Sequence, residues 1–137
     1  MKKFYLLLFT LLFSTAMIAQ NQTKMTAEQV VQENLDFYND RDIDGFMTSF
    51  SDAIEMYNLG DPNPTVVGRA EVRRVYTNLF EKSPELHSTI LKRMVIGNKV
   101  IDHESITGRN GNAKVLELVL IYEVTGQKIS RITVIRK

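Results

Sequence analysis

The stretch LHSTILKRMVIGNKVIDHESIT, residues 86–107, decides the fold. It contains two runs rich in Ile, Val and Thr, which meet at Gly97-Asn98. A glycine at the first central position of a two-residue turn suits the type II′ geometry, which matches the twist of paired strands. The stretch therefore predicts a β-hairpin with two long arms.

The second arm of this hairpin carries three ionisable side chains in succession, Asp102, His103 and Glu104. Because side chains alternate between the two faces of a strand, Asp102 and Glu104 share one face and His103 lies on the other. In the first arm, the same alternation places Ile90 and Arg93 on opposite faces. We therefore predict two neighbouring carboxylates on one surface, with His103 at an interface on the opposite side.

The first residues of the 137-residue chain have the pattern of a secretory signal. Lys2 and Lys3 precede an apolar run over residues 4–13, and small residues then lead to Ala19. The apolar run is too short to span a bilayer, although an uncleaved membrane anchor is the alternative. We predict a signal peptide over 1–19, a linker over 20–25 and one domain over 26–137, exported to the periplasm or extracellular space with no stable membrane insertion after cleavage.

Composition excludes several classes of function. Removing the signal takes two of the 17 basic residues, which leaves 15 against 16 acidic ones and no basic stripe. We therefore expect no nucleic-acid partner. The chain has no cysteine, so stability must come from the core alone, and its two separated histidines predict no metal site. No motif indicates a cofactor.

Three helices are expected before the hairpin. Thr26 with Gln29 forms a capping box at the start of the first helix, and Asp42 is placed to cap the second. Gly68 opens the third helix and Pro84 stops it. Each helix has apolar residues at helical spacing, which indicates one buried face.

The remaining segments read as strands. A short strand is expected over 53–59, and long strands follow the hairpin over 114–124 and 128–135. Both faces of 114–124 are largely apolar, which indicates cover on both sides. The order predicts an α+β fold, with three N-terminal helices packed on one face of a strongly curved antiparallel sheet.

Four segments carry a family resemblance: NDRDIDGF at 39–46, VGRAEV at 67–72, GNKVIDHE at 97–104 and GQKISR at 126–131. With the order of elements, they make the chain similar to the SnoaL-like branch of the nuclear-transport-factor-2-like superfamily, which includes ketosteroid isomerases and polyketide cyclases. The resemblance implies a cone-shaped, cystatin-like fold with a mostly apolar cavity. It also implies a homodimer formed through the convex sheet face.

The catalytic residues of the isomerases do not carry over. Where those proteins have a carboxylate at the end of the first strand, this chain has Tyr57. Their phenolic donor on the first helix corresponds to Asn34, and their acid on the penultimate strand falls near Leu120. The pattern of the epoxide hydrolases is absent too. Steroid isomerisation is therefore not expected.

What the sequence does predict is a pocket that binds a small, mostly apolar molecule. The alternative is an isomerase, cyclase or hydratase that uses Glu104 or Asp102 as general acid or base with the hydroxyl of Tyr57. The two acids also have a structural interpretation, in which Asp102 is solvated near the open end and Glu104 pairs with Arg93 or another cation across the sheet. The side chains predicted to line the pocket are Asn34, Tyr38, Tyr57, Glu104, Leu118, Leu120, Tyr122 and Val134.

Overall fold

The computed structural model describes residues 23–137. The predicted signal peptide at 1–19 and the first part of the predicted linker lie outside the described residues. The helices are α1 (Ala27–Asp40), α2 (Ile43–Thr48) and α3 (Arg69–Glu81), with a short 3-10 turn, η1 (Arg109–Gly111). The strands are β1 (Phe50–Asn58), β2 (Val66–Val67), β3 (His87–Ile96), β4 (Lys99–Thr107), β5 (Leu116–Thr125) and β6 (Lys128–Arg136).

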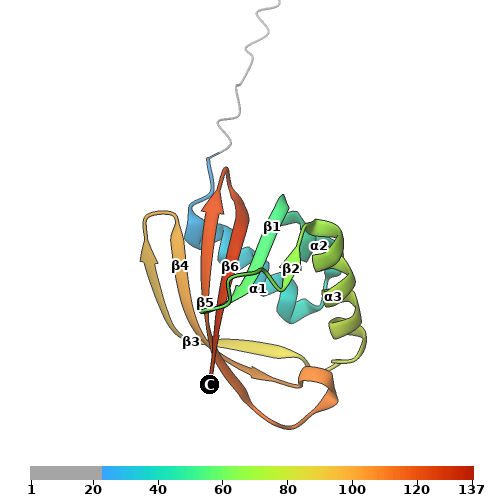
Figure 1. Ribbon diagram of the computed structural model, residues 1–137. Helices are drawn as coiled ribbons and strands as arrows, with labels where there is room; N and C mark the ends of the chain where they lie inside the picture. Colours follow the sequence, from blue (N-terminus) through green and yellow to red (C-terminus); the bar gives the residue numbers. More distant parts are fainter. Residues whose placement is uncertain (1–22) are drawn as a thin grey trace, which may run out of the picture.

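The strands form one six-stranded sheet in the order β2-β1-β6-β5-β4-β3, and the helices pack on its curved inner face (Figure 1). This confirms the predicted α+β fold. From β3 to β6 the strands are antiparallel neighbours, as expected. The sheet as a whole is mixed, because β1 lies beside β6 in parallel.

The helix ends follow their local sequence. The Thr26 side chain accepts a hydrogen bond from the Gln29 amide, and the Gln29 side chain accepts one from the Thr26 amide, which completes the capping box. Asp42 caps α2 by accepting a hydrogen bond from the amide of Gly45. Arg41 lies between them in the left-handed conformation, and its guanidinium donates to the carbonyl of Leu86 just before β3. These contacts fix the first two helices against the start of the hairpin.

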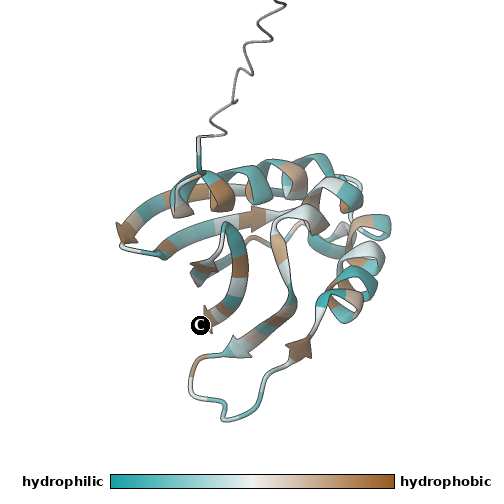
Figure 2. Ribbon diagram, turned by 90° about the horizontal axis from the view of Figure 1, so that it is seen from above, coloured by the Kyte–Doolittle hydropathy of each residue, from teal (hydrophilic) through white to brown (hydrophobic). Residues whose placement is uncertain are grey.

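A cluster of aromatic rings holds the helices to the sheet. It joins α1, α2, β1 and α3, with ring centroids between 4.6 and 6.3 Å apart and mostly edge-to-face. Such pairs contribute about 1 kcal/mol each beyond the apolar area they bury. Hydrophobic and hydrophilic residues are interspersed along both the helices and the strands (Figure 2). The rings belong to Tyr38, Phe46, Phe50, Tyr76 and Phe80.

The hairpin has the predicted turn and one unpredicted irregularity. Gly97 has a φ of 59° between the paired residues Ile96 and Lys99, as a type II′ turn requires. In β3, a bulge between Ile90 and Lys92 shifts the register. Ile90 is therefore opposite Glu104 and Arg93 opposite Asp102. The prediction that Ile90 and Arg93 lie on opposite faces is wrong, because the extra residue in the bulge resets the alternation.

Candidate functional site

A cavity of about 90 Å³ lies between the helices and the inner face of the sheet. Its walls are mostly apolar side chains, interrupted by a few polar groups that converge on the same space. The lining residues come from α1, α2 and α3, from the sheet strands β1, β4, β5 and β6, and from η1. They are Asn34, Leu35, Tyr38, Phe46, Met56, Tyr76, Glu104, Ile106, Arg109, Leu118, Leu120, Tyr122, Ile132, Val134 and Arg136.

Seven of the eight side chains predicted to line the pocket are among these residues. The eighth, Tyr57, is not. Because neighbouring residues of β1 point to opposite faces, it is Met56 that reaches the cavity. The Tyr57 hydroxyl donates to Glu55 at 2.9 Å, and its ring lies 4.0 Å from the guanidinium of Arg131. The prediction that Tyr57 points into the pocket is wrong.

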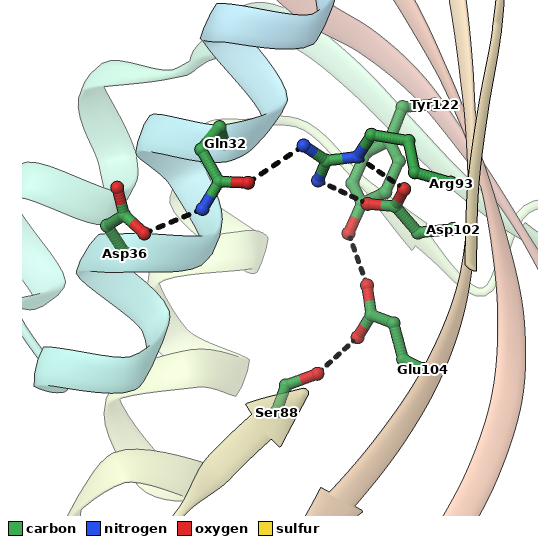
Figure 3. Close-up of polar contacts among 7 residues, drawn as sticks. All are labelled: Gln32, Asp36, Ser88, Arg93, Asp102, Glu104 and Tyr122. Atoms are coloured by element: carbon green, nitrogen blue, oxygen red, sulfur yellow. Dashed lines mark hydrogen bonds and ion pairs between the residues drawn. The ribbon is translucent and has the colours of Figure 1, made fainter. Parts of the chain in front are cut away.

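Glu104 is the one acidic side chain among the lining residues, and it is 3% exposed. Ser88 donates to its Oε2 at 2.7 Å and Tyr122 to its Oε1 at 3.3 Å (Figure 3). Burial raises the pKa of Glu104 to about 7, an effect that Asp102 reinforces and the two hydrogen bonds oppose. Near neutral pH, this carboxyl is therefore divided between its protonated and ionised forms.

Asp102 has a different environment, although it shares the same face of β4. It is 1% exposed, and Arg93 donates two hydrogen bonds to it, from Nε to Oδ1 at 2.7 Å and from Nη2 to Oδ2 at 2.8 Å. The remaining Nη1 of Arg93 donates to Gln32 on α1 at 2.8 Å (Figure 3). Asp102 is thus neither solvated nor a cavity residue, and the prediction that it lies near the open end is wrong.

The predicted pair between Glu104 and Arg93 is also wrong. The bulge in β3 brings Arg93 opposite Asp102, and the paired geometry occupies both oxygens of that carboxylate. A bidentate pair of this kind is strong and directional. It leaves Glu104 with hydroxyl partners and no paired cation. The effect of burial on the pKa of Glu104 is therefore not offset.

Tyr38 contributes an unusual polar group to the cavity wall. The residue is 8% exposed, and its buried hydroxyl makes no hydrogen bond of good geometry among the described residues, although the Arg109 side chain is close enough to act on it as a donor. Burial raises the pKa of Tyr38, and the nearby positive charge of Arg109 opposes that effect. Asn34, one turn earlier on α1, donates to the Phe46 carbonyl at 3.4 Å.

Two arginines that the sequence analysis did not single out complete the site. Arg109 lies in η1 and is partly exposed, while Arg136 lies at the end of β6 and is exposed. Arg136 is two residues after the predicted lining residue Val134, so alternation along the strand places both on the inner face and could have indicated Arg136. No periodic signal marks Arg109, because it follows the strand in a turn.

On the outer face of the sheet, His103 Nε2 lies 2.6 Å from Glu117 Oε1. Within residues 23–137, no group of three His, Asp or Glu side chains is arranged to hold a metal ion. Over the same residues, no helix is both long and apolar enough to cross a membrane.

The fold and cavity define a class of protein, the α+β domains in which helices close a hollow on a curved sheet. A model of the SnoaL-like domain matches residues 31–132. Because this span is most of the chain, the protein belongs to the SnoaL-like domain family. The sequence has no significant match among curated proteins.

Solved structures show the same fold at low identity. A cystatin-fold protein from Novosphingobium aromaticivorans is 21% identical with a TM-score of 0.74, over 82% of this chain and 99% of that one. An NTF2-like protein from Cytophaga hutchinsonii is 14% identical with a TM-score of 0.70, over 85% and 94%. TerC, co-crystallised with polyporic acid, is 14% identical with a TM-score of 0.66, over 81% and 91%. At these identities, the likeness concerns the fold alone.

Proposed function

We propose that this domain binds a small, mostly apolar molecule in the cavity between α1 and the sheet. The observation that carries the proposal is the buried hydroxyl of Tyr38 in the cavity wall, which makes no well-formed hydrogen bond although the Arg109 guanidinium lies near it. Leaving a buried hydroxyl without a hydrogen-bond partner costs roughly 1–3 kcal/mol, so a partner for this group would stabilise the protein. A bound molecule with an oxygen or nitrogen atom at this point would supply it.

The shape of the cavity supports a binding role. A concave, largely apolar space with a few convergent polar groups is typical of small-molecule sites. The co-crystal of TerC with polyporic acid supports the same role, because that protein shares the fold. The volume of about 90 Å³ sets the scale of the ligand. An apolar cavity of roughly 150 Å³ holds benzene, so one ring is the largest body we expect here, and it fits only if part of it extends through the cavity mouth.

The enzymatic alternative is less well supported. It needs Glu104 or Asp102 to act with Tyr57. However, Tyr57 lies outside the cavity, and the carboxylate of Asp102 is already paired with Arg93. Glu104 retains a pKa near 7, yet each of its oxygens already accepts a hydrogen bond from the protein. A carboxyl held in this way serves more readily as part of the wall than as a base.

Binding can be tested with benzene and benzamide as probes, followed by NMR chemical-shift titration. We expect both to bind wild type, and Leu120→Trp, which fills the cavity, to abolish binding of both. Tyr38→Phe should weaken the binding of benzamide about fivefold, which corresponds to the loss of one hydrogen bond, and should leave the binding of benzene unchanged. Tyr57→Phe removes the same hydroxyl outside the cavity and is the matched control. Undiminished binding to Leu120→Trp would place the ligand elsewhere and reject the proposal.

We further propose that the protein acts after export, on the basis of its basic and apolar first residues. The intact mass of the protein purified from its source would test this. A chain that begins at Gln20 is expected, and one that still begins at Met1 would contradict it.

A further inference from the structure

The outer end of the cavity is formed by two arginines from separate parts of the chain. Arg109 belongs to η1, which follows β4, and Arg136 ends β6, so that both lie at the same end of the molecule (Figure 1). The inner end is formed by Glu104 and Tyr122, which are 3% and 5% exposed. A molecule in the cavity would therefore have one end against buried groups and the other against these cations.

The position of Arg109 is fixed by its loop. Gly108 adopts a φ of 71°, and its backbone lies so close to Glu85 that a Cβ would be 2.1 Å from the Glu85 carbonyl oxygen. The amide of Asn110 donates to the Ser83 hydroxyl at 2.8 Å. The loop is therefore attached on both sides of Arg109, which fixes the backbone from which this side chain reaches the cavity wall beside Tyr38.

Neither arginine has an acidic partner. Among the described residues, every ion pair involves other cations, from Arg69–Asp52 to Lys137–Glu117. Arg136 donates to the side-chain oxygen of Asn58, which is neutral. Elsewhere in the described residues, Arg69, Arg73, Arg74 and Arg93 all meet carboxylates, whereas these two guanidinium groups retain their capacity to bind an anion.

The two charges act on the same point. Burial raises the pKa of Tyr76, and both Arg109 and Arg136 oppose that effect. The tyrosine lies in the cavity wall, so both cations are near enough to influence one place in it. Glu104 also acts on Tyr76, where it raises the pKa, but it is one carboxyl against two guanidinium groups and is fully ionised only above neutral pH. The mouth therefore carries an excess of positive charge beside an apolar wall.

We propose that the ligand carries an anionic group, a carboxylate or similar small oxyanion, bound between Arg109 and Arg136, with its apolar body inside against Leu118 and Leu120. The planar guanidinium offers paired N–H donors that match the two oxygens of such a group. The partly enclosed position strengthens the attraction relative to open water. This inference rests on the proposed binding function, since it specifies the chemical class of the molecule bound there.

Matched probes that differ in charge test the inference. Benzoate, benzamide and benzylamine share one ring, and butanoate with butanamide gives a smaller pair. By NMR titration or calorimetry at pH 7 and low salt, we expect each carboxylate to bind about tenfold tighter than its amide. Benzylamine should bind more weakly than benzamide, because the mouth repels cations.

Variants assign the effect to the two arginines. Arg109→Gln and Arg136→Gln should each weaken the binding of benzoate five- to tenfold. The affinity for benzamide should change less than twofold in both variants. Arg131→Gln is the control, because Arg131 lies over Tyr57 outside the cavity. Thermal unfolding of each variant, expected within a few degrees of wild type, establishes that all are folded.

The outcomes separate the two proposals. The anionic ligand is rejected, and the binding function stands, if the amides bind in the cavity but the carboxylates bind no tighter. The same holds if the variant with both arginines replaced binds benzoate as tightly as wild type. Tighter binding of benzylamine would reject it as well. If no probe of either size shifts any cavity resonance, the proposed function is rejected and this inference with it.

Discussion

At the scale of single residues, Asp102 and Glu104 show how far two identical functional groups can diverge within one strand. Both are at least 97% buried and point to the same face of β4. Arg93 offsets the burial of Asp102 with a bidentate pair, whereas Glu104 has only the hydroxyls of Ser88 and Tyr122. A buried charge that lacks a counter-ion takes up a proton instead, which is the behaviour of Glu104.

Glu104 should make stability depend on pH in an identifiable way. Its pKa is raised from 4.5 to about 7 on folding, so between these values the folded chain holds a proton that the unfolded chain has released. The free energy of unfolding therefore falls as pH rises through this window, by roughly 3 kcal/mol for a shift of this size. The contribution is fully lost above pH 7. Urea unfolding at pH 5 and pH 8 should show that Glu104→Gln removes this part of the slope.

The control for this measurement is Glu81→Gln, which changes an exposed glutamate at the end of α3. It should keep the wild-type difference between pH 5 and pH 8. An unchanged pH slope in Glu104→Gln would show that Glu104 does not hold a proton in the folded state at neutral pH.

At the scale of elements, Gly108 is the point at which β4 passes into η1. Its φ of 71° disfavours any residue with a side chain, and its backbone also lies against Glu85. Gly97, in the hairpin turn, has a similar φ of 59° but nothing within 4 Å of a Cβ. The two glycines therefore share a conformational requirement and differ in steric contact.

Alanine substitution should separate these two effects. Gly97→Ala is expected to cost about 1 kcal/mol of unfolding free energy, because only the left-handed conformation opposes it. Gly108→Ala should cost roughly 3 kcal/mol or more, since the backbone must also move away from Glu85. Urea unfolding of both variants gives the comparison. Equal losses of unfolding free energy in the two variants would mean that the loop at Gly108 can move at little cost. Arg109 would then not be held in place by this loop.

The same elements show which parts of the fold the sequence could predict. Capping residues and apolar spacing located α1, α2 and α3, and the Gly97-Asn98 turn located the hairpin. The predicted lining residues on β4 and β5, namely Glu104, Leu118, Leu120 and Tyr122, all lie in the cavity wall. The bulge in β3 could not be predicted, because no residue of the local sequence marks it, and without it Arg93 is not placed opposite Asp102. The parallel pairing of β1 likewise depends on a strand far along the chain. Tyr57 is expected in the pocket only because its position matches that of the family's carboxylate, and alternation along β1 puts Met56 there instead.

At the scale of the whole molecule, the convex face of the sheet remains the predicted site of a homodimer. Its central strands place Ile101 opposite Ile121, and Val119 opposite Ile135, across the outer surface. All four side chains are partly exposed. Apolar residues aligned in this way across three neighbouring strands form a surface that a second copy could cover.

Light scattering with size-exclusion chromatography tests the dimer. Wild type is expected at twice the mass of the chain, and Ile121→Lys at the mass of one chain, because a charge at the centre of the face would be buried without a partner. Leu91→Lys, on the edge strand β3 and 52% exposed, is the control and should remain dimeric. A monomeric wild type at millimolar concentration would reject the dimer.

The parallel contact between β1 and β6 has a consequence for how the protein is made. Glu55 and Arg131 are register partners, yet 76 positions separate them. While a ribosome is still adding those residues, β1 has no neighbour except the two residues of β2, and the aromatic rings beside it have no sheet to cover them. The nascent chain therefore stays open until late in synthesis. An open chain of this kind can be threaded through a translocation pore, whereas one that closed early would have to be unfolded first.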